Sequence, residues 1–249
     1  MTPNATAREG RLAYESGQWE RGDLLRPGGI ELTVRAILCC GLMPGARVLD
    51  VGCGAGTSLC YLQQTLGLNV TGIDMSASAY MQTLPAATDR APMVQGDGTC
   101  LPFATNSMDA VIAECTLSLI EDKQKVLAEC FRVLTGQGRL VITDVYARNP
   151  QAVERLRAFR GTCVSGMIVR EELETELASQ GFQVEMWEDH SDVLKHLLFR
   201  IVMEHGSLQQ LWTRDGTKKQ EAERINQAMR DVRPGYFLLI AVKKRGMQQ

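Results

Sequence analysis

Three glycines within five residues form the strongest chemical signal in this chain. Gly52, Gly54 and Gly56 follow the apolar run Val48–Val51 and precede a helical pattern that begins at Thr57. Glycine lets the backbone turn sharply, and it lets a ligand approach without a Cβ in the way. The first N–H groups of the following helix have no partner within the helix, so they can hold a polar or anionic group. This order predicts a nucleotide site at the carboxyl edge of an α/β sheet.

The spacing of the glycines narrows the class of nucleotide. The dinucleotide pattern G-x-G-x-x-G needs glycine where Thr57 stands, and the phosphate loop of NTPases needs a lysine that this segment lacks. An adenosine ligand without a pyrophosphate is therefore expected. Asp74, 18 residues after Gly56, ends the second predicted strand and is placed to accept both ribose hydroxyls. Asp97 ends the third predicted strand, where it would meet the adenine rim.

Cys115 directly follows the fourth predicted strand, where a thiol nucleophile could act. Such a thiol needs an activating base or a lowered pKa, and the neighbouring Glu114 disfavours the thiolate. We therefore expect Cys115 to be unreactive. The eight cysteines contain no Cys-x-x-Cys pair, so we expect reduced thiols that pack in the interior, as in cytoplasmic proteins. The scattered spacing of these cysteines also argues against arsenite as a substrate.

The three histidines lie late in the chain, at His190, His196 and His205. Intervals of 6 and 9 residues do not match the i,i+4 spacing of a helical metal pair, so no metal site is predicted. His190 and His196 are weak candidates for a pocket-lining group or a general base, and Tyr14 is a third. The alternative is that the histidines are polar residues on a solvated helix.

Strand-like and helix-like runs alternate from Arg47 onward, which predicts a parallel sheet built from right-handed βαβ units. The expected strands are Arg47–Gly52, Asn69–Asp74, Met93–Asp97, Met108–Glu114, Arg139–Tyr146, Phe182–Asp189 and Tyr236–Lys244. The expected helices are Ile30–Cys40, Thr57–Leu66, Ser76–Leu84, Asp122–Leu134, Pro150–Arg160 and Arg170–Gln180. Together they predict a Rossmann-like, seven-stranded, mostly parallel sheet with helices on both faces.

Two segments interrupt this alternation within what we expect to be a single domain, residues 1–249. Residues 1–29 form a polar N-terminal cap, and residues 190–235 form a helical insertion between the core, 30–189, and the last strand and tail, 236–249. The apolar positions of the insertion fit one helix face. Such a face packs on its own domain or on a second copy of the chain, so a homodimer through the insertion is one expectation. Trp187 lies beside the insertion, where we expect it to line a pocket wall.

Composition excludes several classes of protein. The chain has 27 Lys and Arg against 29 Asp and Glu, and 45% of its residues are hydrophobic. This mixture is that of a globular protein, and it lacks the basic surface expected of a nucleic-acid binder. The apolar run near the end, Tyr236–Val242, is too short to span a bilayer, and the polar start has no secretory signal. We therefore expect a cytoplasmic protein with a small-molecule partner.

The chain resembles the class I S-adenosylmethionine-dependent methyltransferases, in particular the small-molecule group that includes the quinone-biosynthesis methyltransferases. The resemblance rests on four stretches in the family's order, Val48–Gly56, Gly72–Ser76, Gly96–Phe103 and Met108–Val111. It implies nine cofactor contacts. These are Gly52, Cys53, Gly54, Glu114 and Cys115 at the methionine and sulfonium end, Asp74 at the ribose, and Met75, Asp97 and Gly98 at the adenine.

The resemblance implies in-line transfer of a methyl group from S-adenosylmethionine to a small or medium-sized acceptor, with S-adenosylhomocysteine as the product. No Asn/Asp-Pro-Pro-Tyr motif follows the fourth strand, which argues against methylation of nucleic-acid bases. The insertion before the last strand leaves the acceptor open. The alternatives are a cofactor-binding regulatory or scaffold protein without transfer activity, and an enzyme that uses the same cofactor for other chemistry.

Overall fold

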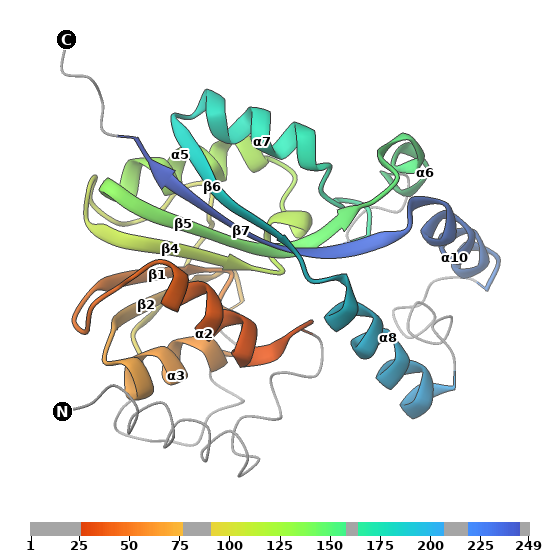
Figure 1. Cartoon of the computed structure of the whole chain (residues 1–249), viewed down its shortest axis with the longest axis horizontal. Coiled ribbons are helices and arrows are strands. Elements are labelled where there is room, and N and C mark those ends of the chain that lie inside the picture. Colours follow the sequence, from red (N-terminus) through yellow and green to blue (C-terminus); the bar gives the residue numbers. More distant parts are fainter. Residues whose placement is uncertain (1–25, 77–90, 158–163, 207–218, 245–249) are drawn as a thin grey trace.

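A seven-stranded sheet organises the part of the chain that the computed structural model describes, residues 26–76, 91–157, 164–206 and 219–244. Its order is β3-β2-β1-β4-β5-β7-β6. The strands are β1 Arg47–Val51, β2 Asn69–Asp74, β3 Met93–Gln95, β4 Met108–Glu114, β5 Leu134–Ala147, β6 Phe182–Asp189 and β7 Pro234–Lys243. Figure 1 shows this sheet between two layers of helices, which is the predicted fold class.

Parallel pairing brings the carboxyl ends of the first five strands to one edge of the sheet. Asp50 near the end of β1 pairs with Gly72 of β2 and with Ile112 of β4. The residues after these strands therefore meet where the chain order reverses, between β1 and β4. Only β7 runs antiparallel, and it lies between β5 and β6. Residues 235–242 of β7 are all buried, because the sheet is covered on both faces.

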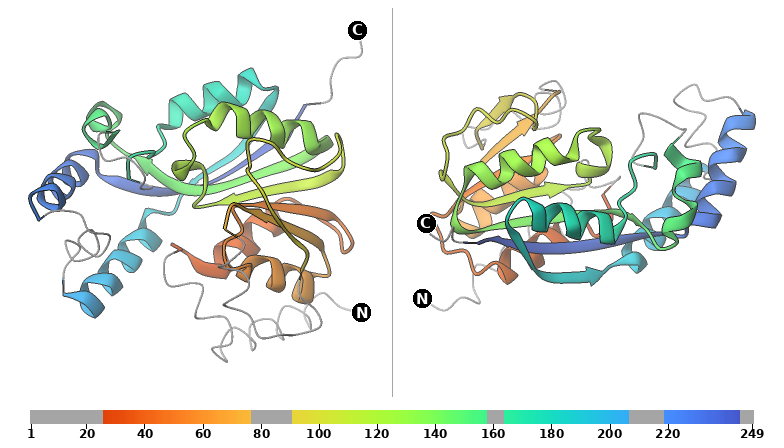
Figure 2. Two further views of the ribbon diagram at one scale, coloured as in Figure 1. Left: turned by 180° about the vertical axis from the view of Figure 1, so that it is seen from behind. Right: turned by 90° about the horizontal axis from the view of Figure 1, so that it is seen from above.

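Two hydrophobic layers hold the helices on the sheet (Figures 1 and 2). Helices α2, Gly29–Cys39, and α3, Thr57–Leu66, pack on one face, where Leu32, Leu59 and Leu62 are buried. Helices α5, Lys123–Val133, and α7, Arg170–Ser179, pack on the other face. A short 3₁₀ helix, η2, Leu117–Leu119, connects β4 to α5.

The remaining helices lie beyond one end of the sheet, on the right in Figure 1. A 3₁₀ turn, η3, Pro150–Ala152, and a short helix, α6, Glu154–Arg157, pack against α10, Lys219–Val232, in a third hydrophobic cluster. Helix α8, Ser191–His205, follows β6 and contacts β7. The segment between β6 and β7 is thus helical wherever the structure describes it, as its apolar pattern predicts.

Most predicted elements coincide with the observed ones, and the differences have local causes. Strand β5 begins at Leu134 instead of Arg139, because Leu134 pairs with Met108 before a bulge shifts the register. The predicted helix Pro150–Arg160 is divided into η3 and α6. The predicted cap and the predicted helix Ser76–Leu84 fall almost entirely outside the described residues.

Trp187 packs against the sheet, and the cap and part of the insertion that would complete its expected pocket wall lie outside the described residues. Its ring stacks on Phe237 with centroids 4.2 Å apart, and the Arg170 guanidinium lies 4.6 Å above it. Neither described cavity includes this tryptophan. It packs against the hydrophobic cluster on the α5 and α7 face, where aromatic stacking stabilises the sheet.

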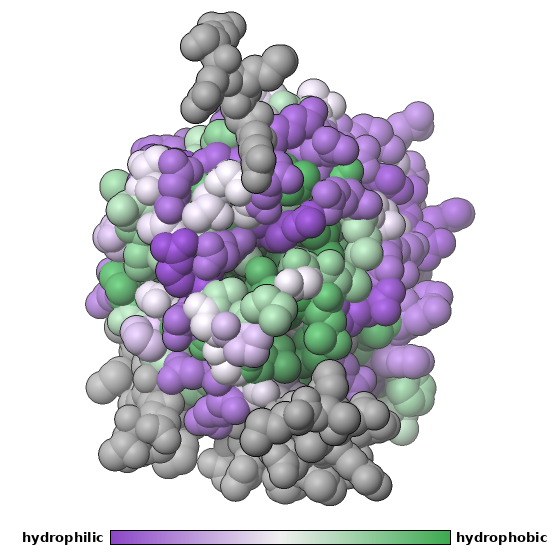
Figure 3. Space-filling model, turned by 60° about the vertical axis from the view of Figure 1, so that its left-hand side comes forward, coloured by the Kyte–Doolittle hydropathy of each residue, from purple (hydrophilic) through white to green (hydrophobic). Residues whose placement is uncertain are grey.

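The surface has mixed polarity, as the composition predicts. Figure 3 shows one face on which apolar side chains gather in a central patch surrounded by hydrophilic ones. Exposed apolar side chains of the described residues include Leu38 in α2 and Met43 just after it, 67% and 73% exposed. Within the same residues, no helix has the length and apolar character needed to cross a membrane.

Candidate cofactor site

The glycine turn after β1 adopts a conformation that favours glycine at three positions. Gly52, Gly54 and Gly56 have φ angles of 78°, 51° and 74°, in the left-handed region. A Cβ on Gly52 would lie 2.2 Å from Oγ1 of Thr116, so this position also requires close approach. A Cβ on Gly54 would meet no atom within 4 Å, which leaves open space beside the backbone. The turn therefore has a fixed shape and an accessible side.

Asp74 links the end of β2 to this turn. The Gly54 N–H donates to its Oδ2 over 2.8 Å, and the Ser76 N–H donates to its Oδ1 over 2.8 Å. Each carboxylate oxygen has a second lone pair, so both can still accept from hydroxyl groups. The two backbone donors thus orient a carboxylate beside the glycine turn.

A cavity of about 190 Å³ lies at the ends of β1 and β4. It contains five of the nine predicted cofactor residues. Its lining residues are Arg26, Asp50, Gly52, Cys53, Gly54, Ala55, Thr57, Ser58, Glu114 and Cys115. The structure therefore brings the glycine turn and the end of β4 into one site, which we call the cofactor cavity.

Glu114 forms the polar centre of the cofactor cavity. Its Oε1 accepts a hydrogen bond of 2.6 Å from Thr33 in α2, and its Oε2 accepts one of 2.8 Å from Ser58 in α3. Arg26 forms an ion pair with the same carboxylate and also donates to Ser58. The Arg26 and Glu114 side chains are 15% and 7% exposed. This is a largely desolvated pair, held by groups from α2, α3, β4 and the segment before α2.

Arg26, Thr33 and Ser58 are site residues that the sequence reasoning missed. Arg26 and Glu114 lie 88 positions apart, and no motif connects them. The signal in the sequence is indirect, because a carboxylate at the end of a buried strand needs a compensating partner. Which residue supplies that partner depends on how α2 packs.

Burial sets the protonation of two other groups in the cofactor cavity. It raises the pKa of Asp50 well above its ordinary range, and the nearby Glu114 carboxylate raises it further. Burial also raises the pKa of the Cys115 thiol. The Cys115 Sγ lies 3.0 Å from the hydroxyl of Tyr236, which donates to Thr143 over 3.2 Å. The neutral thiol belongs to a buried hydrogen-bond network, in agreement with the expectation that it is unreactive.

Three of the predicted adenine contacts lie outside the lining of the cofactor cavity. Met75 follows Asp74 directly, and its side chain is 72% exposed. Asp97 is on the surface after β3, where its Oδ1 accepts from the Thr99 N–H over 2.8 Å, a contact that lowers its pKa. Gly98 packs close to Val51, 3.0 Å from the position of a Cβ. These residues border the ends of β1 and β2 but do not enclose a volume there.

The two histidine candidates for a general base do not line the cofactor cavity. The His190 Nε2 is 2.9 Å from Glu188 Oε2, and Arg35 holds the same carboxylate by two hydrogen bonds. These partners lower the Glu188 pKa to about 2. His196 is exposed on α8, and Tyr14 lies outside the described residues. Neither histidine lines a described cavity.

The described residues contain no group of three or more histidine, cysteine, aspartate or glutamate side chains arranged to hold a metal ion. Seven of the cysteines are described, and all seven are free thiols. Cys163 lies outside the described residues.

Comparison with known proteins relates the middle of the chain to methyltransferases. Residues 49–142 match the family described as "Methyltransferase domain". The chain is 33% identical over 126 residues to phosphoethanolamine N-methyltransferase of Triticum aestivum, covering 49% of this chain and 25% of that protein. It is 39% identical over 107 residues to demethylmenaquinone methyltransferase of Renibacterium salmoninarum, covering 42% and 43% respectively. The chain thus spans less than half the length of these relatives.

A likeness to a solved structure extends over most of the fold. The crystal structure of the [4+2]-cyclase SpnF superposes with a TM-score of 0.69 and 24% identity, covering 87% of this chain and 81% of that one. At this identity the likeness shows the fold alone. The strand order and the family match over residues 49–142 agree with the resemblance to class I S-adenosylmethionine-dependent methyltransferases that the four sequence stretches carry.

Proposed function

We propose that the protein is an S-adenosylmethionine-dependent methyltransferase that acts on a small-molecule acceptor. The observation that carries this proposal is the hydrogen bond from Gly54 to Asp74, which joins the glycine turn to a carboxylate at the neighbouring strand end. The methyltransferase family match covers this segment and supports the same conclusion. The names of the relatives also support a small-molecule acceptor, because phosphoethanolamine and demethylmenaquinone are small molecules.

The chemistry of the site fits the proposed cofactor. S-adenosylmethionine carries a ribose diol and an amino-acid end with one ammonium and one carboxylate. A carboxylate that keeps free lone pairs suits the diol, as Asp74 offers, and the Glu114 carboxylate suits the ammonium. The Arg26 guanidinium suits the carboxylate, since such pairs form charge-assisted hydrogen bonds. In the proposed complex, Arg26 and Glu114 exchange part of their mutual pairing for the two ends of the zwitterion.

The nine predicted contacts are retained in the proposal. We assign Asp74 to the ribose, and the assignments for the other parts of the cofactor follow the sequence analysis. They are Gly52, Cys53, Gly54, Glu114 and Cys115 for the methionine and sulfonium end, and Met75, Asp97 and Gly98 for the adenine. Arg26 is added at the carboxylate of the amino-acid end.

When bound, the cofactor supplies an electrophilic methyl group, so the protein's tasks are orientation and the exclusion of water. The fixed glycine turn orients, because its backbone conformation leaves little freedom. The buried groups of the cofactor cavity exclude water. Among them, the neutral Cys115 thiol offers no competing nucleophile. No proton acceptor for the substrate is assigned. His190 and His196 stay predictions, as do the homodimer, the absence of a nucleic-acid partner and the cytoplasmic location.

Calorimetry with S-adenosylhomocysteine tests the ribose assignment. We expect Asp74→Ala to weaken binding by at least about tenfold, because it removes an acceptor of charge-assisted hydrogen bonds. The matched control is Asp192→Ala, which removes an exposed aspartate from α8 and should leave the affinity unchanged. Equal affinity of wild type and Asp74→Ala would exclude this role for Asp74.

Transfer itself needs a separate measurement, because cofactor binding is shared by the alternatives. We expect radiolabelled methyl groups to pass from S-adenosylmethionine to a component of a pool of small metabolites. Tight cofactor binding with no transfer to any pool would instead favour the regulatory or scaffold role, or an enzyme of other chemistry.

A further inference from the structure

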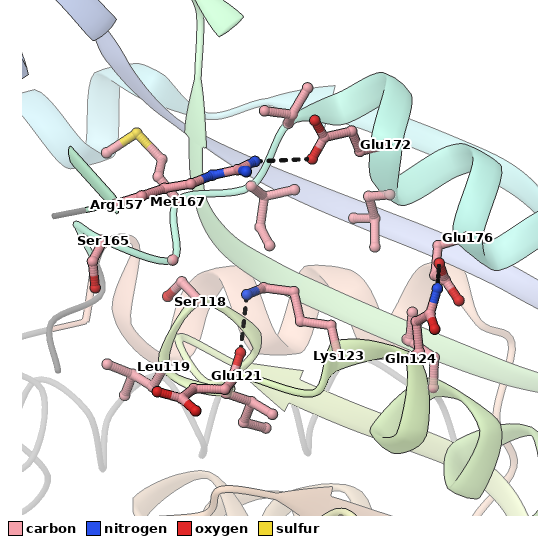
Figure 4. Close-up of a pocket in the computed structure, with 16 residues that line it drawn as sticks. Ser118, Leu119, Glu121, Lys123, Gln124, Arg157, Ser165, Met167, Glu172 and Glu176 are labelled. Carbon is pink, nitrogen blue, oxygen red and sulfur yellow. Dashed lines mark hydrogen bonds and ion pairs between the residues drawn. The ribbon is translucent and has the colours of Figure 1, made fainter. Parts of the chain in front are cut away.

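A second and larger cavity lies between α5 and α7 (Figure 4). These two helices cover the other face of the sheet from α2 and α3 (Figure 1). Its volume is about 450 Å³, within the range of small-molecule sites, roughly 300–1,000 Å³. It shares no lining residue with the cofactor cavity. We call it the α5–α7 crevice.

A hydrogen-bonded wall closes the end of the crevice nearest β4. Ser118 donates to the buried Asp144 through its N–H over 2.8 Å and through its hydroxyl over 2.7 Å. Gly166 lies against the Ser118 carbonyl, which would be 1.8 Å from a Cβ at this position. Ser118 follows Cys115, a lining residue of the cofactor cavity, by three positions in the chain.

Lys123 provides a cation inside the crevice. Its side chain is partly buried, and Figure 4 shows the ammonium group pointing into the space opposite Ser118. The ammonium donates one hydrogen bond of 2.9 Å to the Ile120 carbonyl oxygen. An ammonium has three donors, so it can also bind a ligand. Burial lowers the Lys123 pKa, which shows that this cation lacks full solvation.

Arg157 provides a second cation at the opposite wall. It pairs with Glu154 over 2.8 Å and with Glu172 over 3.6 Å. The arginine side chain is 49% exposed and the two carboxylates are 75% and 67% exposed. Ion pairs with such exposure contribute little free energy, so an anion in the crevice can replace one of them.

Carboxylates also lie around these cations, and the buried Asp144, whose charge raises the Lys123 pKa, is itself held by two hydrogen bonds from Ser118. Glu121 points away from the Lys123 ammonium in Figure 4, and Glu176 accepts a hydrogen bond of 2.8 Å from Gln124. Glu172 faces Arg157 near the solvent. The base of the crevice is apolar, with buried side chains that include Leu127, Ile168 and Leu173.

We propose that the α5–α7 crevice binds a small organic carboxylate with an apolar body, at a site separate from the cofactor cavity. Lys123 and Arg157 hold the carboxylate, and the apolar base receives the hydrocarbon part. The proposal goes beyond methyl transfer and does not depend on it, since no residue of the cofactor cavity takes part.

Three probes that share one hydrocarbon chain test the charge preference by calorimetry. Octanoate carries the proposed carboxylate, octanamide is neutral and octylamine is a cation. We expect octanoate to bind at least about tenfold more tightly than octanamide, with octylamine the weakest, because hydrogen bonds to charged groups are the stronger ones. Equal binding of the three probes, or preference for octylamine, would overturn the proposal.

Paired variants locate the bound carboxylate. Lys123→Gln and Arg157→Gln should each weaken octanoate binding at least about fivefold. The matched controls are Lys125→Gln on the same helix and Arg155→Gln on α6, neither of which lines the crevice. Thermal unfolding of each variant shows whether it is folded. If either control weakens binding as much as its partner, the carboxylate binds elsewhere and the assignment is wrong.

Saturation with S-adenosylhomocysteine distinguishes this site from the cofactor cavity. The octanoate affinity should change by less than about twofold, since the two cavities share no lining residue. An octanoate affinity that falls in proportion to the S-adenosylhomocysteine concentration would show one common site and overturn the proposal. If S-adenosylhomocysteine does not bind at all, the proposed function fails, whereas the octanoate measurements still decide the crevice.

Discussion

The cofactor cavity and the α5–α7 crevice are built by different kinds of contact. Backbone conformation shapes the first, through three left-handed glycines and the Gly54–Asp74 hydrogen bond. Side chains of two ordinary helices contribute much of the second, where Lys123 donates to a backbone carbonyl and Arg157 sits in ion pairs that are about half exposed or more. The first cavity therefore has little freedom to change shape, whereas the walls of the second can rearrange around a ligand.

This difference determines what each cavity tolerates. A substitution in the glycine turn meets fixed backbone and must distort the site. A substitution at an exposed ion pair of the crevice changes charge while leaving the helices in place. The two sites can therefore be disturbed separately. Two glycine variants test that claim through ligand affinity, with the larger expected loss first, and a third variant tests the buried Asp50 through the pH dependence of stability.

Gly52→Ala should have the largest effect. Its Cβ would lie 2.2 Å from Thr116 and its φ of 78° strains any other residue. Backbone strain alone costs about 1–3 kcal/mol, and we expect S-adenosylhomocysteine binding to fall at least about 100-fold by calorimetry, since 1.4 kcal/mol is a factor of ten. Octanoate binding should persist in folded protein.

The control for this variant is Gly45→Ala. Gly45 has a φ of 87°, but a Cβ there would meet no atom within 4 Å, so it reports strain without a clash. The double variant Gly52→Ala with Thr116→Gly removes the clashing side chain and should recover part of the affinity. Similar affinities for Gly52→Ala and Gly45→Ala would show that the Thr116 contact is unimportant.

Gly166→Ala should have an intermediate effect, confined to the crevice. Its Cβ would overlap the Ser118 carbonyl, a backbone group that cannot rotate away. Overpacking of this kind costs about 1–3 kcal/mol, measured by urea unfolding. Octanoate binding should weaken at least about fivefold, while the affinity for S-adenosylhomocysteine stays within about twofold of wild type. Equal losses in both affinities would show that the wall couples the cavities.

Asp50→Asn should change the pH dependence of stability. Burial raises the Asp50 pKa in the folded protein, so its carboxyl favours folding fully below its unfolded pKa of about 4. That contribution is lost as pH rises toward the folded pKa, by up to about 1.4 kcal/mol per pH unit. The asparagine variant has no such titration. The free energy of unfolding in urea should therefore fall more steeply between pH 5 and pH 8 for wild type than for the variant. Parallel plots of this free energy against pH would show that the Asp50 pKa is not raised in the folded protein.

The alternation of strands and helices predicted the core of the fold well. Strands β2, β4 and β6 and helix α3 begin and end at the predicted residues. Buried strands are recognisable because their apolar residues are contiguous, and glycine marks the turn where the backbone needs a positive φ. The same signals placed Gly52 and Gly54 in the cofactor cavity beside Glu114.

Tertiary contacts account for what the sequence did not predict. The pairing of Arg26 with Glu114 depends on how α2 packs, and that information is spread over many apolar side chains. The crevice arises because α5 and α7 leave a space between them, and no local pattern encodes a space. Trp187 shows the same limit, since its stacking on Phe237 depends on the register of β6 against β7.

The position of β7 has a consequence for biosynthesis. This strand is the last in chain order, yet it lies between β5 and β6 and hydrogen-bonds to both. While the ribosome is still making the polypeptide, β6 has no neighbour in the sheet, and one edge of β5 stays unpaired. Unpaired edges of this kind are prone to aggregate. The nascent protein can therefore complete its sheet only after residues 234–243 emerge, and the edges of β5 and β6 stay open until then.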